Sequence, residues 1–267
     1  MCTPYLDAYN VHVAVYTVHS GYAVRMATQK KGEPEASLWE RMERPAPAQR
    51  AALTPQKIAA VAVRVADAEG FAAVTMRRLA AELGVAPMAA YRHVSGKEDL
   101  LALMVDLVSA ELTPAPGATG WRDVLRESAR ATRAMALRHR WMADLPTPLH
   151  ALTPNRFAVA ERQLAALDGH GLDVDTMMAA FRTVTAYVGG MVRSEVLLSE
   201  YLRQQEWESP DEARRGLAPQ MNYLMGTGRY PTYQRYIHEA TRKDDPSWEF
   251  ETGLDCVLDG IAARFGI

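Results

Sequence analysis

Residues 74–100 constrain the fold most, because two short helix patterns meet there at a glycine-containing corner. Thr75 is predicted to cap the first helix, since its hydroxyl can accept a hydrogen bond from a free amide at the helix start. Gly84 is expected to end this helix, because glycine adopts the left-handed conformation found just past helix ends. Pro87 fits the first turn of the second helix, where no partner for its missing N–H is needed. The segment therefore predicts a helix, a tight turn and a second helix.

The second predicted helix has an apolar face and an outward face. At about 100° per residue, Ala90 and Val94 point inward. The outward positions are Met88, Ala89, Tyr91 and Arg92. Between positions 75 and 97, four basic side chains stand against one acidic side chain, a local excess of three positive charges. This combination suits the major groove of DNA; the alternative is a solvated, mildly basic helical hairpin.

Length and charge limit the classes of protein that remain. A chain of 267 residues can hold a small head and a larger body. The formal net charge is −2, so binding to a polyanion depends on the local excess in the hairpin. Cys2 and Cys256 have no metal-ligand spacing and form no disulfide framework. No apolar run approaches the roughly 18 residues of a membrane helix, and no signal-peptide leader is evident. We therefore expect a cytoplasmic, nucleoid-associated protein.

The first 52 residues differ in composition from the rest of the chain. Residues 1–25 alternate valine with other residues, which predicts a strand locally. Residues 26–52 carry prolines and charges that predict a flexible arm, with one helical turn at 37–44. Met26 is our hypothesis for the biological start, which intact-mass analysis of natively expressed protein tests. The basic side chains of the arm either contact phosphates or the minor groove or belong to a solvated tail, which we favour.

Helical periodicity continues through the remaining chain. Helices are predicted at 54–69, 97–108, 121–135, 157–167, 173–203 and 247–264. Gly189 and Gly190 interrupt the longest pattern at about 1 kcal/mol each relative to alanine, which predicts close approach by a neighbour or ligand. Residues 204–246 are less regular, and only 231–242 predicts a helix there.

These features resemble the tetracycline-repressor (TetR) family of bacterial transcription regulators. Residues 53–108 carry the resemblance through Thr75, the Gly84-Val85 corner, the Tyr91-Arg92-His93 triplet and Lys97. Residues 152–190 resemble, more weakly, the C-terminal domain of the tetracycline-repressor type. The resemblance implies an all-α fold, with a three-helix helix-turn-helix head at 53–100. A larger ligand-binding and dimerisation domain follows at 101–267, and 1–52 is an extension and flexible arm.

One stretch departs from the family pattern. Positions 86–89, where relatives often place hydrogen-bonding side chains, carry Ala-Pro-Met-Ala. Base recognition is therefore expected from Arg77, whose guanidinium can bind guanine O6 and N7, and possible from Arg92. Met88 and Ala89 are left to pack on thymine methyl groups, while hydroxyl, imidazole and ammonium groups contact phosphate. The expected DNA-binding residues are Thr75, Arg77, Pro87, Met88, Ala89, Tyr91, Arg92, His93 and Lys97.

The resemblance also implies a small-molecule effector that binds the larger domain, shifts the helix after the head and releases DNA. Pocket candidates combine aromatic, sulfur and polar side chains, although each is equally explained as a core residue. They are Trp141, Arg156, Phe157, Tyr187, Met191 and Tyr201. Family members dimerise through two long helices, so we expect a homodimer. The expected interface residues are Met177, Phe181, Val184, Val188, Leu254, Val257, Leu258 and Ile261.

The expected function is that of a ligand-responsive repressor that binds a pseudo-palindromic operator as a homodimer. No cofactor is expected, and His139, His150 and His170 lack the spacing of a metal site. One alternative keeps the fold as a ligand-binding or interaction protein without operator binding, which only the apolar recognition helix supports. The other is a helical enzyme, for which no catalytic set can be assembled from Asp144, His139 and Glu195.

Overall fold

The computed structural model describes residues 37–43, 53–112, 119–145, 152–207 and 209–267. All regular structure in these ranges is helical, as expected for an all-α fold. None of the helices in the described ranges has the length and hydropathy needed to span a membrane. The strand predicted within 1–25 and the proposed start at Met26 lie outside the described residues.

Helix α1 (Leu38–Glu43) is described by itself, and it confirms the helical turn predicted at 37–44. The Ser37 hydroxyl accepts from the Glu40 N–H over 3.2 Å, and the Glu40 carboxylate accepts from the Ser37 N–H over 2.6 Å. This reciprocal pair is a capping box. The described residues from 53 onward belong to a second, compact unit.

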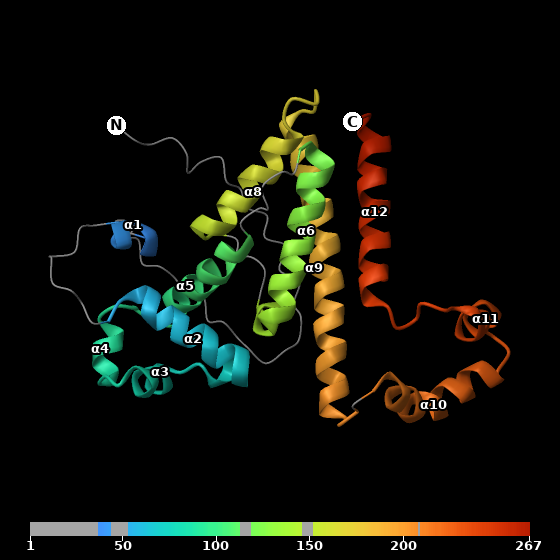
Figure 1. The fold of residues 1–267 in the computed structure, drawn as a ribbon, viewed down its shortest axis with the longest axis horizontal. Helices are drawn as coiled ribbons and strands as arrows, with labels where there is room; N and C mark the ends of the chain where they lie inside the picture. Colours follow the sequence, from blue (N-terminus) through green and yellow to red (C-terminus); the bar gives the residue numbers. More distant parts are fainter. Residues whose placement is uncertain (1–36, 44–52, 113–118, 146–151, 208) are drawn as a thin grey trace, which may run out of the picture. The chain divides into compact units, whose positions relative to one another are not determined.

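The head is built from α2 (Pro55–Glu69), η1 (Phe71–Ala73), α3 (Met76–Leu83) and α4 (Pro87–Tyr91) (Figure 1). Helix α2 begins where the Thr54 hydroxyl accepts from the Lys57 N–H over 3.2 Å. The apolar stripe of α2 is buried and faces α5 (Lys97–Ser109). The three-helix head is therefore confirmed, and α5 closes its core.

Helix α5 belongs to the head and to the body at the same time. It packs on α2 and also on α8 (Pro154–Leu167), and it continues into η2 (Ala110–Leu112). Its buried residues Leu100, Met104 and Val108 follow the predicted stripe. The boundary expected at residue 100 lies within α5, and both sides of it belong to one compact unit.

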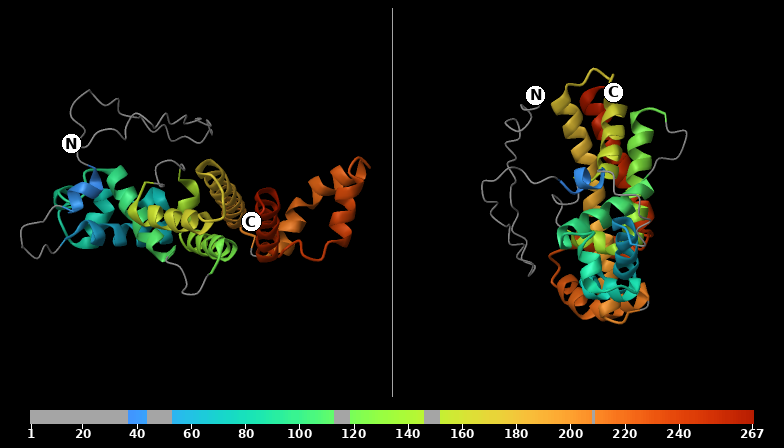
Figure 2. Two further views of the ribbon diagram at one scale, coloured as in Figure 1. Left: turned by 90° about the horizontal axis from the view of Figure 1, so that it is seen from above. Right: turned by 90° about the vertical axis from the view of Figure 1, so that its left-hand side faces the viewer.

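The body is organised around α9 (Val174–Gln204), which contacts α6 (Trp121–Arg138), α8 and α12 (Pro246–Phe265) (Figures 1 and 2). A short η3 (Arg140–Asp144) follows α6. One hydrophobic core runs through these helices and includes Leu125, Val196 and Leu258. Burial of this seam explains why α9 stays a single helix over 31 residues despite its glycine pair.

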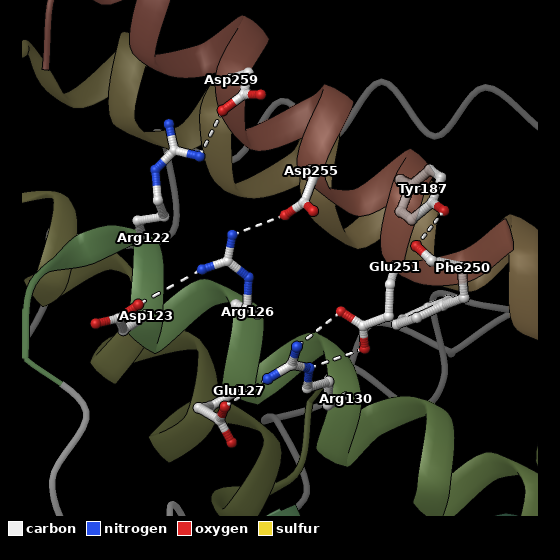
Figure 3. Close-up of polar contacts among 10 residues, drawn as sticks. All are labelled: Arg122, Asp123, Arg126, Glu127, Arg130, Tyr187, Phe250, Glu251, Asp255 and Asp259. Atoms are coloured by element: carbon white, nitrogen blue, oxygen red, sulfur yellow. Dashed lines mark hydrogen bonds and ion pairs between the residues drawn. The ribbon is translucent and has the colours of Figure 1, made fainter. Parts of the chain in front are cut away.

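An ion-pair ladder connects α6 to α12 (Figure 3). Arginines four residues apart on α6 meet carboxylates four residues apart on α12, at N–O distances of 2.6 to 2.8 Å. The pairs are Arg122–Asp259, Arg126–Asp255 and Arg130–Glu251. The descending numbers on α12 show that the two helices run antiparallel. The ladder therefore sets the register of α12 on its own subunit.

Helices α10 (Pro210–Gly226) and α11 (Pro231–Glu239) form an arm that joins α9 to α12 (Figure 2). The expectation of irregular structure over 204–246 was therefore wrong for α10, whose Pro219 and internal Gly216 obscure the helical pattern. The Ser209 hydroxyl caps α10 by accepting from the Glu212 N–H over 3.3 Å. No described side chain of either helix is buried, so the arm has no core of its own.

Gly189 and Gly190 lie on the exposed surface of α9. A Cβ atom added at either position would meet nothing within 4 Å in the subunit. The close approach predicted for this pair is therefore not made by the described residues of the same subunit.

Candidate nucleic-acid interface

The local geometry of the hairpin confirms the turn predicted from its sequence. The Thr75 hydroxyl accepts from the Arg78 N–H over 3.2 Å and so caps α3. Gly84 has φ 66°, in the left-handed region, and the Val85 N–H then donates to the Ala80 carbonyl over 3.0 Å. Pro87 occupies the first turn of α4. Each feature holds the second helix at a defined angle to the first.

The two faces of α4 also separate as predicted. Ala90 and Val94 are 0% and 1% exposed, whereas Met88 and Tyr91 are 70% and 47% exposed. Arg92 is exposed as well. Ala89 and His93 are half-buried, so Ala89 faces outward less than expected. The exposed surface of α4 is therefore formed by a thioether, a phenol and a guanidinium.

The adjacent arginines of α3 have different environments. Arg78 donates to Glu69 over 2.7 Å and to Glu82 over 3.0 Å. These hydrogen bonds, first to Glu69 and then to Glu82, raise the pKa of Arg78 above its ordinary value. No ion pair holds Arg77 or Arg92 among the described residues. The charge of Arg78 is therefore compensated within the head, while Arg77 is available to a polyanion.

A shallow hollow of about 370 Å³ lies at the start of α3. It is lined by Ala73, Thr75, Arg77, Arg78 and Ala81. Thr75 keeps its hydroxyl proton free to donate here, because the capping bond uses only an oxygen lone pair. The Thr75 hydroxyl and the uncompensated Arg77 guanidinium therefore line one surface depression. Both are groups of the kind that bind phosphate oxygens.

Lys97 stands at the start of α5 with its Nζ 4.8 Å from the centre of the Phe71 ring. This cation–π contact holds the ammonium beside η1. The Asp99 carboxylate accepts from the Ser95 N–H over 3.3 Å, so an acidic group already lies at this helix start. At this end of α5 the Lys97 ammonium is therefore the group that could bind an anion.

The Thr75 cap makes a measurable contribution to stability. Thr75→Ala is expected to lower the free energy of unfolding by about 1 kcal/mol, because a free amide at the start of α3 loses its partner. Thr75→Ser keeps the hydroxyl and serves as the matched control. Urea denaturation of the two variants measures the difference, and equal stability of the alanine and serine variants would contradict a capping role.

The six pocket candidates do not converge on one site. Trp141 is buried at the junction of head and body, where its Nε1 donates to Asp67 over 2.8 Å and its ring stacks on Phe71. Phe157 and Tyr201 are exposed, and Tyr201 lies edge-on to Trp207. The structure therefore gives Trp141 a role in joining two parts of the fold.

The other three candidates are half-buried. The Tyr187 hydroxyl donates to the Phe250 carbonyl over 2.7 Å (Figure 3). Met191, four residues further along α9, packs against the core. Burial raises the pKa of Tyr187 and lowers that of Arg156. Arg156 lies in the first turn of α8 and has no ion pair among the described residues.

The eight residues expected at a dimer interface lie on α9 and α12, and all of them belong to or pack against the hydrophobic core of one subunit. Five belong to its buried core, namely Val184, Val188, Leu254, Leu258 and Ile261. Met177, Phe181 and Val257 are partly buried against that core. The seam predicted from the spacing exists, but the helix that fills it belongs to the same chain. The buried members therefore offer little surface to a second subunit.

The candidate enzyme residues also have structural partners. Glu195 receives both guanidinium donors of Arg133, at 2.8 and 2.9 Å. His139 is itself buried and lies between Asp67 and Glu111. The Asp144 side chain lies outside the described side chains. His139 and Glu195 therefore belong to two separate sets of polar contacts and form no catalytic set.

Two sets of ion pairs, one in the head and one in the body, do not follow from helical periodicity. In the head, Arg78 forms ion pairs with Glu69 on α2 and with Glu82 on α3. Only the pair with Glu82, four residues away on the same helix, can be read from the sequence. The ladder had a clearer signal, because three arginines and three carboxylates each recur at intervals of four residues. Such matched spacings predict that the two helices pair, whereas the antiparallel direction comes from the structure.

Comparison with known protein families agrees with this arrangement. The model described as "Bacterial regulatory proteins, tetR family" matches residues 58–104, and the model described as "Tetracyclin repressor-like, C-terminal domain" matches residues 113–265. The chain is similar to the HTH-type transcriptional repressor DrrR1 of Streptomyces coeruleorubidus. Identity is 33% over 226 residues, which span 84% of this chain and 83% of that protein.

Solved structures show the same likeness. ActR of Streptomyces coelicolor, a TetR family protein in complex with actinorhodin, matches with a TM-score of 0.64 and 27% identity, over 80% of this chain and 97% of that chain. BioQ in complex with its double-stranded DNA operator matches with a TM-score of 0.54 and 25% identity, over 79% of this chain and 99% of that chain. The matched proteins are regulators, so the enzyme alternative is wrong.

Proposed function

Because the chain belongs to the TetR family of bacterial transcriptional regulators, we propose that residues 53–100 read a pseudo-palindromic operator and residues 101–267 bind an effector and a second subunit. The observation that carries this proposal is the exposed surface of Arg77, Met88, Tyr91 and Arg92 beside a compensated Arg78. The likeness to BioQ in complex with its operator supports the first part. The likeness to ActR in complex with actinorhodin supports regulation by a small molecule. The protein would act at the nucleoid in the cytoplasm.

The first test separates the two arginines of α3. Arg77→Ala is expected to weaken operator binding by about 1 to 3 kcal/mol and to relax the preference for one guanine in each half-site, because a bidentate base contact is lost. Arg78→Ala removes a side chain that already binds Glu69 and Glu82, so it should keep the wild-type base preference. A binding selection on random DNA measures both. An unchanged consensus for Arg77→Ala would contradict its assignment.

The arm α10–α11 supports a specific mode of dimerisation. Its exposed apolar side chains are Leu217, Tyr223, Leu224, Tyr230, Tyr233 and Tyr236. Two helices without buried residues gain little stability alone, and exposed apolar surface of this kind marks a protein interaction site. We propose that the second subunit of a dimer covers the apolar surface of the arm. The same subunit would also cover the open surface of α9 at Gly189 and Gly190.

A charge placed in the arm tests this assignment. Leu224→Lys is expected to raise the dimer dissociation constant by about 10-fold or more, because a buried apolar contact of roughly 1.5 to 3 kcal/mol is replaced by a charge. Val174→Lys, at an exposed position at the start of α9, is the control. Sedimentation equilibrium measures both constants. A Leu224→Lys protein that dimerises as the wild type does would exclude the arm from the interface.

For the effector, we propose a site within residues 101–267 that includes Arg156, whose half-buried guanidinium has no ion pair among the described residues. A gel-shift titration on the DNA upstream of its own gene, with and without candidate ligands, tests the proposed function as a whole. Specific binding that a ligand abolishes is expected. Ligand binding without any specific DNA complex at physiological salt would favour the alternative of a binding protein that has the same fold.

A further inference from the structure

A polar cluster with a buried imidazole and two partly exposed carboxylates joins the head to the body at His139. The Nδ1 atom of the imidazole lies 2.8 Å from Asp67 Oδ1, and its Nε2 atom lies 3.1 Å from Glu111 Oε1. The Trp141 indole N–H donates to the same Asp67 oxygen over 2.8 Å. The imidazole is only 4% exposed. We refer to Asp67, Glu111, His139 and Trp141 as the His139 joint.

The joint connects parts of the fold that are far apart in sequence. Asp67 belongs to α2 of the head, Glu111 to η2 at the end of α5, and His139 to the end of α6 in the body. Phe71 of the head also stacks on Trp141, with ring centres 6.2 Å apart. Helix α5 already links head and body through the chain itself. A second attachment restrains rotation of the head about that single connection.

The contacts continue from the joint to the DNA-reading hairpin. Asp67 is two residues before Glu69 at the end of α2, and Glu69 binds Arg78 of α3 over 2.7 Å. Arg78 also binds Glu82 further along α3. Arg77, the proposed base-reading side chain, is the neighbour of Arg78. The orientation of α3 is therefore tied to the body by hydrogen bonds and one rigid helix end.

We propose that His139 is a positioning residue that sets the distance between the two recognition helices of the dimer, and thereby the half-site spacing that the operator must have. This inference rests on the proposed binding of a two-fold operator. Helix-turn-helix dimers bind half-sites about one helical turn apart, roughly 34 to 36 Å, or a multiple of this. A head fixed at two points accepts one such spacing. A head attached through α5 alone swings and accepts several.

The experiment compares operator variants in which the wild-type half-sites, first identified by selection on random DNA, are separated by different numbers of base pairs. The wild type is expected to bind one spacing. His139→Ala should weaken binding at that spacing by about 2- to 30-fold and bind neighbouring spacings with similar affinity, with the half-site sequence unchanged. Trp141→Phe, which keeps the ring stack and loses one donor, should show a smaller effect. If His139→Ala does not fold, Trp141→Phe provides the test of the spacing preference.

A loss of stability alone would not move the spacing preference. Ile58→Val, in the buried core of α2 and away from the joint, is the control, and it should keep the single spacing of the wild type. A single spacing in both His139→Ala and Trp141→Phe would overturn the proposal. A change in half-site sequence without a change in spacing would overturn it as well.

A second measurement needs no DNA and separates this proposal from the proposed function. With Cys2 and Cys256 replaced by serine and a spin label on Ala72→Cys, an exposed position in η1, electron resonance gives the distance between the heads of one dimer. His139→Ala should broaden that distribution. An unchanged distance distribution in His139→Ala would contradict the proposal. A wild-type protein that binds no specific DNA sequence would contradict only the proposed function.

Discussion

Leu258→Ala is expected to lower the free energy of unfolding by about 3 kcal/mol, one of the two largest effects predicted for this protein. The side chain is 0% exposed and lies in the core between α9 and α12. Truncation of a buried leucine loses the transfer free energy of the removed atoms and leaves a cavity. Urea denaturation, followed by circular dichroism, measures the change.

The location of Leu258 also predicts what should not change. Because the residue packs within its own subunit, the dimer dissociation constant should stay close to that of the wild type. Val257→Ala, the partly buried neighbour, is the control and should cost less. If Leu258→Ala left stability intact and weakened dimerisation, the helical spacing would mark a subunit interface, as the sequence pattern alone suggests.

Glu195→Ala is expected to lower the free energy of unfolding by about 2 kcal/mol, because two hydrogen bonds between charged groups are lost and the Arg133 guanidinium keeps only the Ser247 hydroxyl as a hydrogen-bond partner. Glu251→Ala removes a carboxylate with the same two-donor geometry, at 2.8 Å from both nitrogens of Arg130. Glu251→Ala should lower the free energy of unfolding by less than about 1 kcal/mol, because an exposed ion pair contributes little. The side chains of Arg133 and Glu195 are 16% and 24% exposed, whereas those of Arg130 and Glu251 are 46% and 37% exposed.

Salt is the control for this comparison. Added sodium chloride should reduce the cost of Glu251→Ala, since exposed charges are screened, and should change that of Glu195→Ala much less. Thermal unfolding at low and high salt measures both. Equal costs for the two substitutions would mean that solvent exposure does not determine the strength of these pairs.

Most of the fold could be predicted because the helices depend on local signals. The Thr75 cap, the left-handed Gly84 and the proline at the start of α4 are each determined within a few residues. The inward positions Ala90 and Val94 follow from helical periodicity alone. The arm at α10 escaped prediction because its prolines and glycine weaken the pattern, and because no buried stripe marks a helix without a core.

The all-α class, the helix-turn-helix and the basic residues of its surface follow from the amino-acid sequence, since capping, turn chemistry and periodicity act over short distances. Which of those residues are available for binding depends on how the helices pack. Arg78 is compensated by Glu69, and Leu258 is covered by its own subunit. His139 joins Asp67 and Glu111, which are 72 and 28 residues away in the chain. Such pairings depend on how helices pack, and periodicity within one helix carries no information about its neighbour.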